Sequence, residues 1–144
     1  MSLLIENKKV HFNYEILEEM EAGIELLGFE VKSLRKKNGS LDGAHITVRG
    51  SEGYLIGMTI PPFQPANAPK DYDQSRIRKL LLTKKEIEEM AGKEKQKGLT
   101  IVPISVYNKG RKLKVGIGIV RGKKSLINAK VLRSVKLIEK PEEP

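Results

Sequence analysis

Carboxylates crowd one early segment of the chain and are its first candidates for chemistry: Glu18, Glu19, Glu21, Glu25 and Glu30. Paired carboxylates can act as general acid and base, and with a lysine they could support magnesium-dependent RNA cleavage. On a strand, Glu19 and Glu21 would share one face because side chains alternate. The alternative is a solvated strand edge on which charges hinder unwanted pairing. The pattern favours the solvated strand edge, and cleavage of RNA by the purified protein would instead indicate catalytic carboxylates.

Other catalytic groups are scarce. With no Cys in the chain, thiol nucleophiles, disulfides, zinc ribbons and iron–sulfur clusters are excluded. The two histidines, His11 and His45, have no partner nearby in the sequence. The segment from Gly118 to Lys124 resembles a phosphate loop, but three residues separate its glycines where four are needed. We therefore expect a binding protein rather than an enzyme, with no metal and no cofactor.

Positive charge is concentrated in the second half of the chain. The 144 residues carry a net charge of +9, yet residues 1–72 hold 8 basic and 10 acidic side chains. Residues 73–144 hold 19 basic and 8 acidic ones, and no acid stands between Glu94 and Glu139. Such asymmetry favours a phosphate-bearing partner over a basic face kept for solubility. Because the chain has only seven Phe and Tyr and no Trp, we expect binding to folded RNA rather than stacking of single-stranded bases on aromatic rings.

Strands are expected to dominate the elements that position these side chains. Alternation predicts a strand over 10–16, and hairpins over 45–49 with 54–60 and over 99–107 with 112–119. A short helix is predicted over 29–36, a loop over 61–72, and a helical region over 73–97 in which Thr83 and Glu86 form a capping box. Gly116 and Gly118 share a face, which leaves room for another protein backbone or for a nucleic-acid backbone. The pattern predicts a mainly β fold, a small antiparallel barrel or sandwich with inserted helices, and an OB-type barrel suits a basic chain of this size.

The chain shows neither a membrane-length apolar run nor a secretory leader, so we expect a cytoplasmic protein with no membrane partner. Its length predicts one domain with a tail. We assign residues 1–124 to an RNA-binding body and 125–144 to a basic tail. In the tail, Ile127, Val131, Val135 and Ile138 form a stripe with helical spacing.

Several motifs together resemble the SsrA-binding protein family (small protein B). They match in order and spacing over about residues 6–124 and are Asn7-Lys8-Lys9, Glu21-Ala22-Gly23, Gly28-Phe-Glu-Val-Lys-Ser-Leu-Arg35, Arg76-Ile-Arg-Lys-Leu-Leu-Leu82 with Glu86-Ile87, Lys97-Gly98-Leu99-Thr100-Ile-Val-Pro103 and Gly122-Lys123-Lys124. The resemblance implies an OB-type barrel of antiparallel strands with about three short helices, and an adaptor role in trans-translation. Such a protein, expected as a monomer, binds the tRNA-like domain of transfer-messenger RNA and delivers it to stalled ribosomes for rescue and peptide tagging. A general OB-fold binder of single-stranded RNA is the alternative function.

The resemblance also implies which residues bind RNA: Asn7, Lys8, Glu21, Lys32, Arg35, Arg76, Arg78, Lys79 and Leu81. Arg76, Arg78 and Lys79 would contact phosphates. Glu21 would either accept from a ribose hydroxyl or a guanine edge, or hold the protein's own basic residues in place. Leu81 would either pack under an exposed base or belong to the core.

The tail would enter the decoding centre of the small ribosomal subunit and contact its RNA through Gly122, Lys123, Lys124, Lys130, Arg133 and Lys136. It departs from the family pattern, because Ser125-Leu-Ile-Asn-Ala-Lys130 stands where the family has Asp-Lys-Arg and a long basic run. Two alternatives remain for the helical stripe: it forms a helix on the ribosome, or it packs on the protein's own barrel.

Overall fold

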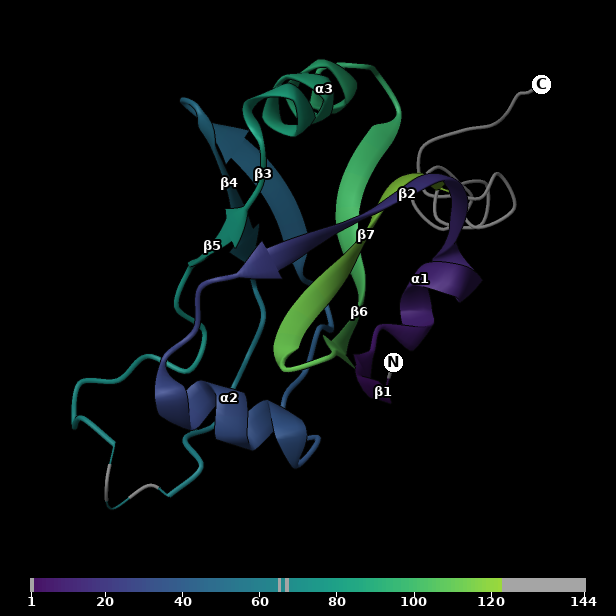
Figure 1. Ribbon diagram of the computed structural model, residues 1–144. Coiled ribbons are helices and arrows are strands. Elements are labelled where there is room, and N and C mark those ends of the chain that lie inside the picture. The colour runs from purple at the N-terminus through teal and green to yellow at the C-terminus, as the bar shows by residue number, and fades with distance from the viewer. Residues whose placement is uncertain (1, 65, 67, 123–144) are drawn as a thin grey trace, which may run out of the picture.

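The computed structural model describes residues 2–64, 66 and 68–122. Three helices and seven strands occupy this part of the chain (Figure 1). The helices are α1 (Lys8–Asn13), α2 (Gly28–Arg35) and α3 (Lys84–Glu94). The strands are β1 (Ser2–Glu6), β2 (Tyr14–Ile24), β3 (His45–Arg49), β4 (Glu52–Ile56), β5 (Arg78–Leu81), β6 (Leu99–Lys109) and β7 (Lys112–Gly122). The prediction of a mainly β protein with three helices is confirmed.

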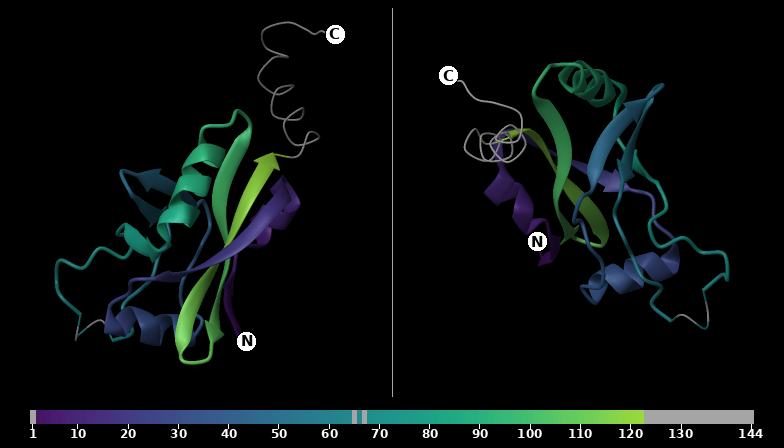
Figure 2. Two further views of the ribbon diagram at one scale, coloured as in Figure 1. Left: turned by 45° about the horizontal axis from the view of Figure 1, so that its top comes forward. Right: turned by 180° about the vertical axis from the view of Figure 1, so that it is seen from behind.

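All seven strands belong to one antiparallel sheet in the order β1-β6-β7-β2-β5-β4-β3. The sheet is curled, so that β3 at one edge packs against β6 near the other. Figure 2 shows the β3–β4 hairpin facing the β6–β7 hairpin across the molecule. Within the described residues the edge strands β1 and β3 do not pair, so the ladder is not closed into a barrel. The expected antiparallel strands are confirmed, and the expected barrel closure is not.

Alternating side chains give the sheet an inner and an outer face. On β7, Leu113, Val115 and Ile117 are buried in the main core, while Lys112 and Lys114 point the other way. The helices α2 and α3 lie toward opposite ends of the sheet (Figure 1), where Leu34 and Met90 are fully buried. On the outer face, α1 covers only part of β6 and β7 through a small cluster around Val10, Val102 and Val120. Elsewhere on the outer face, Leu81 is exposed and Lys114 is partly exposed.

Both predicted hairpins are present, with somewhat different bounds, and the capping box forms as expected. The backbone N–H of Glu86 donates to Thr83 Oγ1 at 3.2 Å, and that of Thr83 donates to Glu86 Oε1 at 2.9 Å. These bonds satisfy donors that a helix start leaves without partners, and they fix the beginning of α3 at Lys84.

Two predicted elements are wrong in part. The strand expected over 10–16 begins only at Tyr14, because residues 8–13 form α1. The alternation there was misleading, since Val10 is buried but Phe12 is 76% exposed. The helical region expected over 73–97 is helical only from Lys84 to Glu94, and Arg78–Leu81 form the strand β5.

No helix in the described part of the chain is long and apolar enough to cross a membrane. The helical stripe expected between Ile127 and Ile138 lies outside the described residues.

Candidate nucleic-acid interface

Strand register brings the predicted site residues of β2 and β5 together with residues of β7 on the outer face. Gly23 of β2 lies opposite Leu81 of β5 on one side and opposite Lys114 of β7 on the other. Two residues earlier on β2, Glu21 lies opposite Gly116. Segments far apart in the sequence thereby form one continuous surface.

A groove of about 350 Å³ lies on this surface and is called the basic groove below. It is lined by Gly23, Ile24, Leu26, Val31, Arg35, Leu81, Arg111, Lys112, Leu113 and Lys114. The lining contains four cations and no carboxylate. Leu81 is 52% exposed, so of its two expected roles the core role is excluded. Cationic side chains around an exposed apolar one suit a nucleotide, whose phosphate is charged and whose base is not.

Three of the four groove cations were not among the predicted site residues. Arg111, Lys112 and Lys114 follow the tip of the β6–β7 hairpin, and Arg35 joins them from α2. The guanidinium of Arg35 donates to the carbonyl of Arg111 at 2.8 Å, which ties α2 to that tip. All three missed residues lie in the segment between Glu94 and Glu139, which has no acidic residue and could have indicated them.

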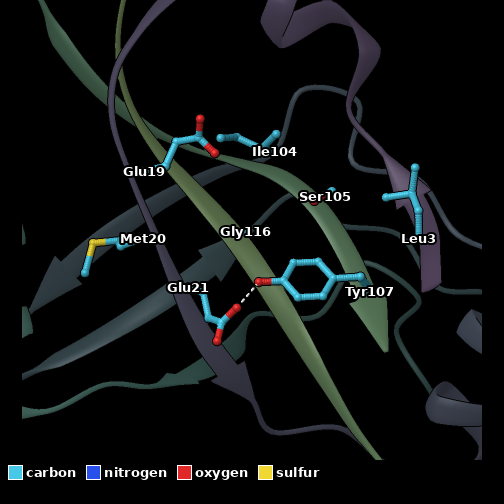
Figure 3. A pocket seen from close by; sticks show the side chains of 8 residues that line it. All are labelled: Leu3, Glu19, Met20, Glu21, Ile104, Ser105, Tyr107 and Gly116. Atoms are coloured by element: carbon cyan, nitrogen blue, oxygen red, sulfur yellow. Dashed lines mark hydrogen bonds between the residues drawn. The ribbon is translucent and has the colours of Figure 1, made fainter. Parts of the chain in front are cut away.

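Beside the groove, Glu21 is held by two donors from β6. The hydroxyl of Tyr107 donates to Glu21 Oε2, and Lys109 Nζ donates to Oε1 at 2.7 Å. Figure 3 shows Tyr107 reaching Glu21 across β7 at Gly116, where no side chain stands between them. The Lys109 bond first, and then the Tyr107 bond, lower the pKa of Glu21 below its usual value. Burial and the bond to Glu21 raise the pKa of Tyr107 to about 12. Glu21 is therefore a fixed, ionised acceptor at neutral pH.

Lys79 on β5 lies on the outer face but is paired. Its Nζ lies 2.7 Å from Glu52 Oε2, and the hydroxyl of Tyr54 donates to the other carboxylate oxygen. The bonds from Lys79 and Tyr54 lower the pKa of Glu52, and the bond to Glu52 raises the pKa of Lys79. The charge of Lys79 is thus partly compensated before any RNA binds.

Arg78 and Arg76 are directed to the protein's own Glu30 rather than to a free surface. Arg78 is fully buried, and its Nη2 lies 2.7 Å from Glu30 Oε2. The same guanidinium also donates to three backbone carbonyls, those of Met58, Arg76 and Gln74. Arg76 is partly exposed and binds Glu30 through two bonds of 2.6 and 3.0 Å.

Burial alone would raise the pKa of Glu30. Bonds from Arg76, the Leu27 N–H, Tyr72 and Arg78 overcome that effect and lower the pKa to about 2. This network joins α2, β5 and the loop that carries Tyr72. Both arginines thus have a structural role, which the phosphate-contact prediction did not foresee.

The remaining predicted residues divide between the interior and the surface. Asn7 is buried, and its Nδ2 donates to the carbonyl of Pro103 at 3.0 Å and, more weakly, to that of Leu41 at 3.4 Å. Lys8 and Lys32 are exposed, but neither lines the basic groove. Gly122 ends β7 opposite Tyr14. Lys123, Lys124, Lys130, Arg133 and Lys136 lie outside the described residues.

The alternative of a carboxylate-based active site gains no support from the geometry. Glu18 pairs with Lys93 at 2.7 Å, while Glu21 and Glu30 have the partners described above. Across residues 2–64, 66 and 68–122, no group of three or more His, Cys, Asp or Glu side chains could hold a metal ion.

Gly118, expected to leave room for another backbone, instead lies against Ile104 of the chain itself.

Comparison with known proteins agrees with the resemblance. The family model described as "SmpB protein" matches residues 4–135 and so extends into the tail. Proteins named SsrA-binding protein are similar over most of their length: that of Microcystis aeruginosa is 43% identical over 86% of this chain and 80% of its own. That of Elusimicrobium minutum is 46% identical over 81% of this chain and 74% of its own.

A solved structure described as "tmRNA-SmpB: a journey to the center of the bacterial ribosome" has a similar fold. It superposes with a TM-score of 0.73 at 38% identity and covers 97% of this chain and 98% of its own. The family model, the relatives and the fold agree, and the chain belongs to the SmpB, or SsrA-binding protein, family.

Proposed function

We propose that the protein is the RNA-binding adaptor of trans-translation. It binds the tRNA-like domain of transfer-messenger RNA and carries this RNA to stalled ribosomes for rescue and peptide tagging. Family membership supports this role, as does the similarity to a structure described as transfer-messenger RNA with SmpB in the bacterial ribosome. The protein works as a monomer in the cytoplasm and binds rather than catalyses.

The observation that carries the proposal is the basic groove. Arg35, Arg111, Lys112 and Lys114 lie around the exposed Leu81 in a lining without a carboxylate. Cations placed in this way neutralise phosphates of folded RNA, whose contacts dominate affinity. Leu81 offers an apolar surface to a base that leaves its stack.

The proposed site residues fall into two classes. Lys8, Glu21, Lys32, Arg35, Lys79 and Leu81 act at or near the RNA, together with Arg111, Lys112 and Lys114. Asn7, Arg76 and Arg78 act by holding the loops and strands beneath that surface, because their polar groups already bind the protein itself.

We further propose the division into a body over 1–124 and a tail over 125–144. The body is a partly open member of the OB-type barrels, supported by the curled antiparallel sheet in which β3 packs against β6. The tail contacts ribosomal RNA of the decoding centre through Lys130, Arg133 and Lys136, together with Gly122, Lys123 and Lys124 at the end of the body.

Charge variants matched in number test the groove. The first variant combines Arg111→Ala, Lys112→Ala and Lys114→Ala, and the control combines Lys84→Ala, Lys85→Ala and Lys95→Ala around α3. Binding of the tRNA-like domain is measured across a salt series. We expect the groove variant to reduce the slope of log affinity against log salt by about two units, since each phosphate contact contributes about 0.7–0.9. Equal losses in the two variants would show that only net charge matters.

Competition with an unstructured RNA completes the test. The adaptor role predicts that this competitor displaces the tRNA-like domain only at large excess. Equal competition would instead indicate a general binder of single strands.

A further inference from the structure

A second cavity, of about 550 Å³, lies next to the basic groove and is called the Glu21 pocket. It is lined by Leu3, Glu19, Met20, Glu21, Ile104, Ser105, Tyr107 and Gly116. Figure 3 shows the Tyr107 ring and the Glu21 carboxylate on one side of the pocket, with Glu19 and Ile104 at its other end. Apolar and aromatic walls combined with a carboxylate suit a flat group that carries N–H donors.

The hydrogen-bonding capacity of Glu21 is only half used. A carboxylate has about four acceptor positions, two on each oxygen. Tyr107 occupies one position on Oε2 and Lys109 occupies one on Oε1. Each oxygen therefore keeps one acceptor position, and the two donors fix the plane of the carboxylate. Such a group is prepared for two parallel N–H donors.

Among the RNA bases, guanine alone presents two adjacent N–H donors on its Watson–Crick edge, at N1 and N2. The other bases place an acceptor beside each donor, and this acceptor would face the carboxylate. We propose that the Glu21 pocket binds one unpaired guanine of the RNA, with Tyr107 and Lys109 as the residues that position the Glu21 carboxylate. This inference rests on the proposed function and adds to it a base-specific contact.

Charge directs the base rather than the phosphate into the pocket. Glu19 and Glu21 both line it and repel a phosphate, whereas the cations of the basic groove attract one. The two cavities adjoin, because Lys114 lies opposite Tyr107 on β6 and opposite Gly23 on β2. One nucleotide can therefore place its base in the Glu21 pocket and its phosphate over Lys114.

Nucleotide-analogue interference with inosine tests the inference, because inosine lacks the N2 amino group of guanosine. Transcripts of the tRNA-like domain carry about one phosphorothioate-tagged inosine per molecule, and bound and free fractions are cleaved and compared by position. The full-length protein, Glu21→Gln, Tyr107→Phe and the control Glu88→Gln are compared, with melting curves to establish that each is folded. Glu88→Gln makes the same charge change on the exposed face of α3.

We expect wild type and Glu88→Gln to discriminate against inosine by about tenfold at one unpaired guanosine, as for hydrogen bonds to a charged group. This penalty should vanish in Glu21→Gln and shrink in Tyr107→Phe. If Glu21 had a merely structural role, its substitution would instead lower affinity equally for RNA with guanosine and for RNA with inosine. Tight binding without a penalty that depends on Glu21 would overturn the inference and leave the proposed function standing. If wild type fails to bind the tRNA-like domain, both are overturned.

Discussion

Arg78 and Glu30 form an ion pair in which neither side chain is exposed, with 2.7 Å between Nη2 of the arginine and Oε2 of the glutamate. Arg76 and Tyr72 add further bonds to the same carboxylate. Taking charges out of water is costly, and the cost is offset here because every partner in the cluster is hydrogen-bonded. The cluster joins the helix that carries Arg35 to the strand that carries Leu81, so the stability of the fold and the shape of the basic groove depend on it together.

Removal of the Glu30 carboxylate is predicted to destabilise the fold strongly. Glu30→Leu leaves the buried Arg78 guanidinium without its counter-charge, and loss of one partner of a buried pair costs about 3–5 kcal/mol. The free energy of unfolding in urea measures the effect. Lys32→Leu is the control on the exposed side of the same helix and should change stability by about 0.5 kcal/mol or less. Similar values for the two variants would contradict the structural role of the cluster.

The same carboxylate predicts a loss of stability in acid. The pKa of Glu30 is about 2 in the folded protein, against a usual value of 4.5. Because the folded pKa is depressed, the stabilisation is fully present above the unfolded value and is lost as pH falls from about 5 toward about 2. Its size is about 3 kcal/mol. Urea unfolding at several pH values in this range should show a steeper decline for wild type than for Glu30→Leu, and parallel declines would contradict the assignment.

Elements that depend on neighbouring residues were predicted from the sequence, and elements that depend on distant residues were not. The capping box at Thr83 and Glu86 and both hairpins were predicted correctly, because each depends on neighbouring residues. The strand β5 was missed because its pairing with β2 and β4 is determined by residues distant in the chain. The short helix α1 was missed because apolar and polar residues alternate by chance over residues 10–16, which overlap its second half.

The helix expected in place of β5 also explains why the sequence did not distinguish buried from exposed residues of the site. As parts of a strand, Arg78 and Leu80 share one face while Lys79 and Leu81 share the other. Arg78 and Leu80 are buried, and Lys79 and Leu81 face outward. With a helix expected there, nothing separated the buried arginine from its exposed neighbours. The partner of Arg78, Glu30, is 48 residues away, and no local pattern indicates it.

Leu81 and Leu80 are neighbours on opposite faces, so truncating each should give opposite results. Leu81→Ala should leave stability nearly unchanged, since Leu81 is 52% exposed. It should weaken RNA binding by about tenfold, or roughly 1.4 kcal/mol, through lost apolar contact. The salt dependence should stay the same because no cation is removed. Leu80→Ala should instead cost about 2–5 kcal/mol of stability. Undiminished RNA affinity in Leu81→Ala would remove Leu81 from the interface.

Glu52 is predicted to restrain RNA binding through its pair with Lys79. Glu52→Gln removes the negative charge 2.7 Å from Lys79 Nζ and leaves that ammonium available to a phosphate. We expect affinity for the tRNA-like domain to rise several-fold at low salt, and the salt slope to steepen by about 0.7–0.9, as for one added phosphate contact. Glu88→Gln on α3 is the matched control, because it makes the same change in net charge away from the groove. If both variants raise affinity equally, the effect comes from overall charge and Lys79 does not contact the RNA.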